Sequence, residues 1–494
     1  MPSIVETPQS NLRFAVVRRE ITPPVGIYHR MWGAAAHDRA TGVHRPLTAT
    51  AMVFRPEIED TAEVVLVALD LCLLWIHEME TLHRAVCRGA ALDPTALIVT
   101  FSHTHAAGLM GYEREHLPGG ELIRPYLDQV AESVAAAVEE ARRGVRPVTV
   151  VYGYGRCDLA AHRDLWDEAA GAYVCGFDPA TAADDTVLVA RFMAGNETVA
   201  TMVNYACHPT TLAWQNTRIS PDYPGAMREV IEAATGAPCV FLQGAAGELG
   251  PREGFVGDVD VADRNGRKLG YAALATLESL PPPGTRYEYT GPVVSGATIG
   301  TWRHAPLDER SLSDNARWRL KRWTLELPHR AELPSPEATH EERATWQRRE
   351  SEARDRDDHQ AAADARAMVE RLDRRLVRLA GLSGTSFAFP LTLLRAGGAF
   401  WLFVEGEPYS LLQREVRRRF PTTPIVVCEL AGGSRTGYLP PRDLYGRGIY
   451  QESIAVLEPG CLEAIIEEVA ANIENSLCAA QSEAPVQQGM GDNA

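Results

Sequence analysis

Short apolar runs alternate with amphipathic segments along residues 1–304 of the chain. The runs are rich in Val, Ile and aromatic residues, a composition typical of buried strands; they include "AEVVLVALDL", "ALIVTFSHT", "TVATMVNYACH" and "APCVFLQGA". Between them, "HEMETLHRAVCRGA" and "YPGAMREVIEAATG" have the apolar spacing of amphipathic helices. This alternation predicts a layered α/β fold, with residues 1–304 as the first part of the domain.

From residue 305 the pattern changes to a dense run of charges. Residues 305–383 contain "HEERATWQRRESEARDRDDHQAAADARAMVERLDRRLVRLAGL", whose sparse apolar positions predict a long charged helix. With "SDNARWRLKRWTLEL" before it, an αα-hairpin insertion is expected. The charges favour a solvated helix face. A lid over a substrate, or an arm that forms a homo-oligomer, remain alternatives.

Strand patterns return after the charged segment. The runs "SFAFPLTLLRAGGAFWLFVEGE" and "TPIVVCELAGG" predict strands, and "GCLEAIIEEVAANIENSLCAA" predicts a final helix. Residues 384–478 are therefore expected to complete the α/β domain. The polar residues 479–494 are expected to be a disordered tail.

Charge and composition narrow the classes of partner. The chain has 49 Lys+Arg against 65 Asp+Glu, a formal net charge of −16, which argues against nucleic acid and anionic membrane surfaces as partners. No apolar run is long enough for a transmembrane helix, so membrane insertion is not expected. The first residues lack a secretory-signal pattern, and the nine scattered cysteines form no CxxC pair. A cytoplasmic protein with buried, reduced thiols and a small-molecule substrate is expected.

Polar groups that can bind metal follow three of the predicted strands. His103 and His105 come directly after one strand, where alternate residues point the same way. His208 follows a second strand, and Glu405 and Glu407 follow a third. Imidazole and carboxylate are common zinc ligands, and a His-His-Glu set leaves one position open for water. Structural strand-end histidines and a solvated glutamate are the alternative interpretation.

Two glycine-rich stretches lie near these groups in the sequence. The stretch "FLQGAAGELGPRE" includes Gly244 to Gly250; its turn amides can stabilise an oxyanion, although a tight loop that needs glycine is equally consistent. No Lys-Ser/Thr pair of a phosphate-binding loop follows it. The stretch "CELAGGSRTGYLPPRDLYGRGIYQES" contains Tyr438, Tyr445 and Tyr450. Each tyrosine, taken alone, is an ordinary packing residue.

Taken in order, these segments resemble the catalytic domain of the neutral (non-lysosomal) ceramidases, zinc amidases that cleave N-acyl sphingosines. The resemblance spans residues 12–300 and 385–475. It rests on the order of short motifs: "FSHTHAAG", "AAHRDL", "VNYACHPTTL", "VFLQGAAGELGP", "FVEGEPYS" and "RTGYLPPRDLY". The resemblance implies a ceramidase-like α/β domain that binds one Zn²⁺.

The resemblance also implies roles for individual residues. The implied zinc ligands are His103, His208, Glu407 and Tyr438. His105 would face the substrate or the attacking water, and Arg163 stands where the family has a substrate-contacting arginine. The expected substrate-binding positions are His162, Gly244, Gly247 and Gly250. In the implied mechanism, zinc lowers the pKa of a bound water, which attacks an amide carbonyl.

The chain also departs from the ceramidase pattern. Gly250 stands where the family has a serine implicated in catalysis, and His162 replaces a family asparagine. No C-terminal immunoglobulin-like domain and no signal peptide are recognised. These departures argue against ceramide, so the expected function is hydrolysis of an amide in a small soluble molecule. An esterase, a lactonase, a lyase using the same zinc, or a non-catalytic binding protein remain alternatives.

Overall fold

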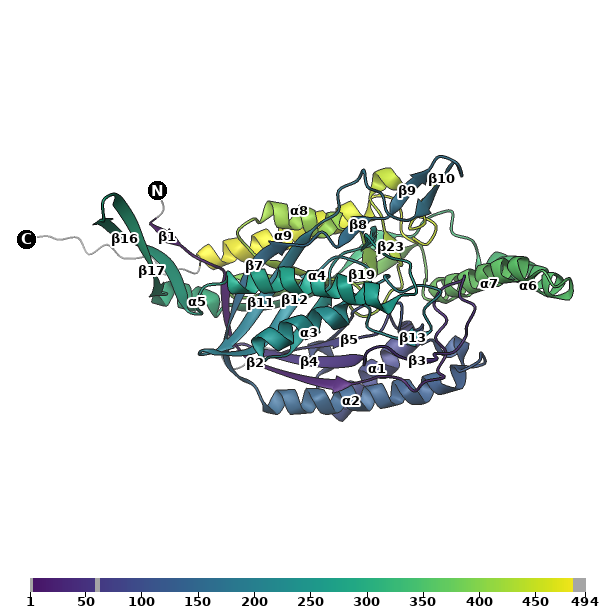
Figure 1. Cartoon of the computed structure of the whole chain (residues 1–494), viewed down its shortest axis with the longest axis horizontal. Helices are drawn as coiled ribbons and strands as arrows, with labels where there is room; N and C mark the ends of the chain where they lie inside the picture. Colours follow the sequence, from purple (N-terminus) through teal and green to yellow (C-terminus); the bar gives the residue numbers. More distant parts are fainter. Residues whose placement is uncertain (1–2, 58–62, 483–494) are drawn as a thin grey trace, which may run out of the picture.

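Two mixed β-sheets form the centre of the protein, which is described here by a computed structural model covering residues 3–57 and 63–482 (Figure 1). The first sheet has, in spatial order, β14 (Cys239–Gln243), β12 (Glu197–Tyr205), β11 (Thr186–Ala194), β7 (Arg146–Arg156), β2 (Gln9–Glu20), β4 (Thr48–Arg55), β5 (Val64–Leu69) and β6 (Leu97–Phe101). The second has β18 (Trp318–Pro328), β19 (Ser386–Ala396), β20 (Ala399–Val404) and β22 (Ile425–Cys428).

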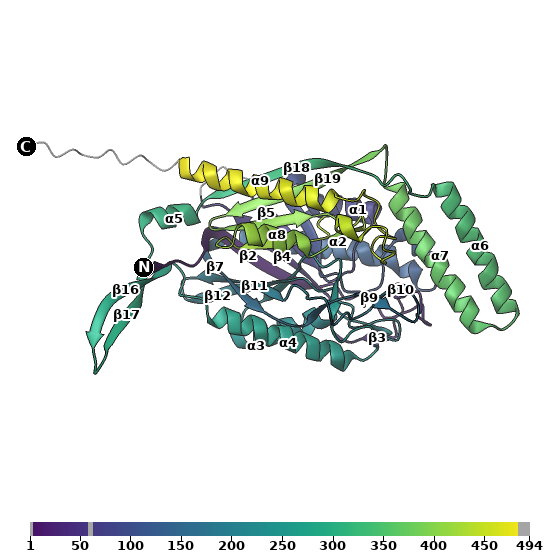
Figure 2. The same ribbon diagram turned by 90° about the horizontal axis from the view of Figure 1, so that it is seen from above.

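Helices cover the outer faces of both sheets, so the predicted layered α/β fold is confirmed. The first sheet carries α1 (Ile76–Gly89), α2 (Ile123–Arg143), α3 (Tyr223–Thr235) and α4 (Val259–Glu278). The second carries α8 (Leu411–Arg419) and α9 (Cys461–Ser482), on the opposite side of the molecule from α3 and α4 (Figure 2). In α1, Met79, Leu82 and Val86 form the buried stripe that an amphipathic helix presents to a sheet.

The inner faces of the two sheets share one apolar core. Phe14 on β2 pairs across the ladder with Phe54 on β4, with ring centroids 5.2 Å apart. Phe54 in turn packs edge-on against Trp401 of β20, at 5.3 Å. Alternate residues of β4, such as Ala51 and Val53, face the helices instead. Because side chains alternate along a strand, one set of residues packs between the two sheets and the other packs against the helices.

The curl of the first sheet brings the carboxyl ends of distant strands together. Its edge strands β14 and β6 come into contact, and the segment after β22 lies between them. There the Glu429 amide donates to Gln243 O (3.2 Å), and the Gly432 amide donates to Val99 O (3.1 Å). Strands β6, β12 and β20 are each parallel to a neighbour. Their carboxyl ends meet at one end of the sandwich, where binding sites of α/β proteins commonly lie.

The charged segment is a helical hairpin for only part of its length, and the run predicted as one long helix is divided into two. Helices α6 (Pro336–Asp355) and α7 (His359–Ala380) form a hairpin that projects from the body (Figure 1). The helix predicted for "SDNARWRLKRWTLEL" is wrong, because Trp318–Pro328 is strand β18, paired antiparallel with β19. Its apolar residues alternate at Trp323, Leu325 and Leu327, and pairing with β19 satisfies its backbone. The short α5 (Glu309–Asn315) is the helical part.

The predicted boundaries shift at the start of the charged segment and at the tail. Residue 305 falls within β17 (Thr298–Pro306), which pairs with β16 (Thr285–Val294) in a hairpin at the far end of the molecule from α6 and α7 (Figure 1). Residues 479–482 of the predicted tail belong to α9, and the rest of that tail lies outside the described residues.

Two further expectations concern membranes and thiols. Within the described part of the chain, no helix combines the length and apolar character needed to cross a bilayer. All nine cysteines are unpaired, and seven are buried as expected. The prediction of burial is wrong for Cys175 and Cys478, which are exposed.

Candidate metal centre

Three of the predicted ligands meet at the open end of the sandwich. His103 follows β6, His208 follows β12, and Glu407 begins the short strand β21 (Glu407–Pro408) beyond β20. The Nε2 atoms of His103 and His208 lie 3.3 and 3.0 Å from the same oxygen, Glu407 Oε2. All three side chains are buried, and their candidate ligand atoms lie within 4.8 Å of one another. They form a group that can hold a metal ion.

Backbone carbonyls orient both imidazoles. Nδ1 of His103 donates to Cys72 O (2.8 Å), and Nδ1 of His208 donates to Ala246 O (2.8 Å). A ring that donates from Nδ1 presents an unprotonated Nε2, which is how metal-bound histidines are commonly held. The Sγ atom of Cys72 lies 3.6 Å from His103 Nδ1, on the side away from Glu407. The group formed by Cys72, His103 and His105 therefore does not compete for His103 Nε2.

The donor set fits a divalent cation such as Zn²⁺. Two imidazole nitrogens and one carboxylate oxygen converge on one point, and all three are ligand types that Zn²⁺ takes in proteins. Burial, with Arg163 second, lowers the pKa of His208 to about 3, which leaves that ring neutral and able to bind a metal. Burial alone would raise the pKa of Glu407, but His103 outweighs it and holds that pKa well below its usual range. Burial opposes protonation of His103, but Cys72 and Glu407 outweigh it and raise its pKa well above the usual value, so a metal ion that binds Nε2 displaces a proton there.

The backbone at His103 adopts a conformation that is rare for a residue with a side chain. Its φ is +64°, in the left-handed region, and such strain costs about 1–3 kcal/mol. The His103 amide donates to Leu71 O (3.0 Å), which anchors the turn. The turn brings the His103 ring to 4.8 Å from the ring of His208. Strain of this kind is typical of functional sites.

Tyr438 and Arg163 stand beside the three ligands. Tyr438 lies in β23 (Tyr438–Leu439), directly opposite Glu407 in the parallel ladder with β21. Its Oη is 3.4 Å from His208 Nε2 and accepts a hydrogen bond from Arg163 Nη2 (3.1 Å). Arg163 Nη2 also donates to Gly247 O (2.6 Å). Burial and Glu407 raise the pKa of Tyr438 well above its usual value, so ligation by Tyr438 requires the charge of the metal ion.

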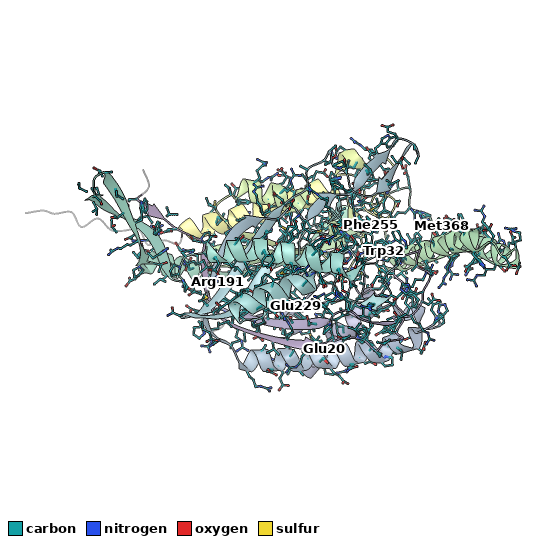
Figure 3. All side chains as sticks on the ribbon, in the orientation of Figure 1. Glu20, Trp32, Arg191, Glu229, Phe255 and Met368 are labelled. Carbon is teal, nitrogen blue, oxygen red and sulfur yellow. The ribbon has the colours of Figure 1, made fainter. Side chains whose placement is uncertain are left out.

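The metal group opens onto a cavity of about 180 Å³. His105 lines it, and its Nε2 has no hydrogen-bond partner among the described residues. Burial, aided by His103, lowers the pKa of His105 well below its usual value, so the ring is neutral. Its ring centroid is 5.2 Å from that of Trp32, which packs on Phe255 at 5.7 Å. Figure 3 shows both aromatic residues at the end of the body from which the α6–α7 hairpin projects.

In the glycine-rich turn, the backbone amides of Gly244 and Gly247 make hydrogen bonds within the protein. The Gly244 amide donates to Tyr205 O (2.9 Å), and the Gly247 amide donates to Pro408 O (3.0 Å), so both are occupied. A Cβ at Gly247 would lie only 2.7 Å from Glu407 O. Glycine at this position therefore allows the turn to pass directly behind the ligand Glu407.

Two other predicted residues lie apart from the metal group. His162 ends β8 (Ala160–His162), which pairs with β15 (Leu249–Pro251), and it is not among the described residues that line the cavity. Glu405 accepts hydrogen bonds from the backbone amide (2.8 Å) and Nε (3.0 Å) of Arg435. That pairing resolves the choice between the two glutamates after β20 in favour of Glu407.

Gly250 has room for the side chain that it lacks. A Cβ there would meet Thr210 Oγ1 at 3.6 Å and Arg163 Cδ at 3.8 Å, which are ordinary contacts. Gly250→Ser is therefore expected to fold, with a free energy of unfolding within about 1 kcal/mol of that of the parent protein. Denaturant unfolding measures this change. A loss above about 3 kcal/mol would show that the space beside Arg163 is closed to a serine.

Three arginines of α7 also line the cavity, and the sequence interpretation missed them. Arg371, Arg374 and Arg378 belong to the run that was assigned to a solvated face. Their spacing of three and four residues places them on one side of a helix, and this was the only signal available. Tyr450, which was singled out only as a packing residue, lines the cavity as well.

Comparison with solved structures identifies the fold. The chain aligns with a ceramidase complexed with C2 at a TM-score of 0.62 and 16% identity, covering 95% of this chain and 76% of that one. Neutral ceramidase from Pseudomonas aeruginosa gives a TM-score of 0.61 at 16% identity, covering 95% and 75%. No protein-family model matches the chain, and no curated protein matches its sequence. The chain therefore has the ceramidase-like fold that the order of its motifs predicted.

Proposed function

We propose, from this ceramidase-like fold and the metal group at its open end, that the protein is a zinc-dependent hydrolase of an amide bond in a small molecule. The observation that carries the proposal is the convergence of His103 Nε2 and His208 Nε2 on one oxygen of Glu407, beside a cavity. The similar solved structures are named as ceramidases, and the bond in ceramide is an amide.

Each residue of the site has a defined part in this reaction. His103, His208 and Glu407 would hold the ion, with Tyr438 as the expected fourth ligand. A bound divalent cation polarises a carbonyl and makes water nucleophilic near neutral pH. His105 lines the cavity and its Nε2 has no partner among the described residues, so it is assigned the transfer of a proton from the water to the leaving amine, with a basicity that burial lowers. Arg163 donates to Gly247 O and Tyr438 Oη beside the ligands, and in this proposal its positive charge would stabilise the oxyanion from behind Tyr438.

The size of the cavity supports a small substrate. Its volume of about 180 Å³ equals roughly six water molecules at about 30 Å³ each. Pockets for drug-sized ligands typically span about 300–1,000 Å³. The cavity volume lies below this range, which favours a small group beside the metal ligands, and we propose a substrate smaller than a ceramide.

A panel of N-acyl compounds and their matched esters tests this function. We expect release of free amine and acid from the amides, at a rate at least about 100-fold above that of chelator-treated protein. Adding Zn²⁺ back should restore the activity. The assay measures new primary amine by fluorescence and acid by chromatography. Turnover of esters alone, or turnover insensitive to chelation, would refute an amidase that depends on the metal.

A further inference from the structure

Helix α7 forms a cationic wall of the cavity, opposite a metal group built by the strands of the body. Arg371, Arg374 and Arg378 all line the cavity from this helix. Their common face follows from spacings of three and four residues. The chain as a whole is acidic, with a net charge of −16. A cluster of three arginines at the one cavity that contains His103 and Glu407 is therefore not a reflection of overall composition.

The wall is fixed to the body and is not a freely solvated arm. Ion pairs join α7 to the loop that follows β2: Arg30 with Glu370 (2.5 Å) and Asp38 with Arg366. Arg374 Nη2 also donates to Met31 O. Gly33 lies so close to the helix that a Cβ would come within 2.7 Å of Ala367 Cβ. These contacts hold the arginine face in place beside the metal group.

Much of the hydrogen-bonding capacity of these half-buried arginines is unused, although Arg374 Nη2 donates to Met31 O. Among the described residues, no side chain makes a hydrogen bond or ion pair with Arg378. The Nε atoms of Arg371 and Arg374 are buried without hydrogen-bond partners in that same part of the chain. Burial lowers the pKa of Arg378 to about 10, so it is still cationic at neutral pH. The acid Glu370 also lines the cavity; its Oε1 pairs with Arg30 (2.5 Å) and Arg366 (3.6 Å), and its Oε2 makes no hydrogen bond to the described residues.

The arginines that line the cavity indicate which kind of ligand it binds. A buried, unpaired charge is costly, and a ligand that supplies the missing acceptors removes that cost. A carboxylate matches the planar guanidinium through two parallel hydrogen bonds. We propose that the substrate is an amide that carries a carboxylate, such as an N-acyl amino acid, and that Arg378 and its neighbours bind that carboxylate. This inference rests on the proposed amidase function and adds the class of substrate.

The test compares an N-acyl amino acid with the uncharged carboxamide of the same molecule. Wild-type protein is expected to prefer the acid in kcat/KM. Arg378→Gln is expected to lower the acid-to-carboxamide ratio by about 10- to 100-fold, as loss of a charged hydrogen bond does; Arg378→Lys should lower it less. Arg375→Gln on the same helix is the control, because Arg375 pairs with Glu342 of α6 (3.2 Å) and does not line this cavity. Arg371→Gln replaces Arg378→Gln if the latter does not fold.

The other possible results distinguish a failure of the carboxylate site from a failure of the proposed amidase function. Equal turnover of acid and carboxamide by the wild type, or a proportional fall of both in Arg378→Gln, overturns the inference. A preference for an N-acyl phosphoethanolamine over the carboxylic acid also overturns it, in favour of a phosphate site. If no amide is cleaved, the amidase proposal fails by itself. Calorimetry of the acid and the carboxamide on the wild type and Arg378→Gln then decides: tighter binding of the acid, lost in the variant, supports the carboxylate site, and equal binding rejects it.

Discussion

Replacing His208 with alanine is expected to remove the bound metal and to lower amide hydrolysis by about 1000-fold or more. His208 Nε2 is one of two nitrogens facing Glu407 Oε2, and its ring is fixed by Ala246 O. Its loss leaves one imidazole and one carboxylate, too few ligands to hold zinc in a catalytic geometry. Metal analysis of protein purified without added metal should find about one zinc per chain in the parent protein and almost none in the variant.

The neighbouring histidine provides the matched control for this experiment. His105 lines the same cavity, yet its Nε2 is not directed at Glu407 and it lies outside the His103–His208–Glu407 group. His105→Ala is expected to retain zinc and to lose activity, which separates binding of the ion from proton transfer. Unchanged metal content in His208→Ala, or equal loss of metal in both variants, would refute the proposed ligand set.

Arg163→Met is expected to lower kcat by about 100- to 1000-fold, the range measured when a donor to a developing oxyanion is removed. The guanidinium is buried between Gly247 O and Tyr438 Oη, and methionine keeps much of its length without its charge. Zinc content should stay at the level of the parent protein. KM should change less than kcat, because the negative charge that Arg163 stabilises on the carbonyl oxygen develops only during the reaction. Steady-state kinetics and metal analysis on the same preparations measure both.

An exposed arginine controls for charge and for stability. Arg252 directly follows β15, and its side chain is exposed. Arg252→Met should leave kcat within about twofold of the parent value, since exposed ion pairs contribute little. A fall of kcat in Arg163→Met that merely follows a loss of zinc or of folded protein, seen by thermal unfolding, would assign Arg163 to stability and not to catalysis.

The strands and the strand-end positions of the ligands were predictable from local pattern. The apolar runs that end at residues 101 and 205 are strands β6 and β12, and His103 and His208 follow them as expected. Their convergence was not predictable from periodicity, because β6 and β12 lie near opposite edges of the sheet and meet only through its curl. The order of motifs supplied that pairing in advance, and the fold comparison supports the same architecture.

The charged segment was harder to interpret because the sequence gives the charges but not which of them contact the body of the protein. The face of α7 that packs on the body depends on Gly33 and Glu370, and one of these lies more than 300 residues away in the sequence. The helix predicted for β18 failed for a related reason. Its lysine and arginines indicated a solvated helix, while its alternating Trp323, Leu325 and Leu327 obeyed the strand period.

The α6–α7 hairpin places the proposed substrate-binding residues and the proposed metal ligands in different segments of the sequence. The proposed metal ligands come from the strands and turns of the body, and the arginines proposed to bind the substrate carboxylate come from one continuous insert. Its tip, at residues 356–358, projects away from the body (Figure 2). Recombination at the two ends of this hairpin would exchange all three arginines of the cavity in one step. A protein with a different hairpin would then bind a different substrate while its metal ligands stay the same.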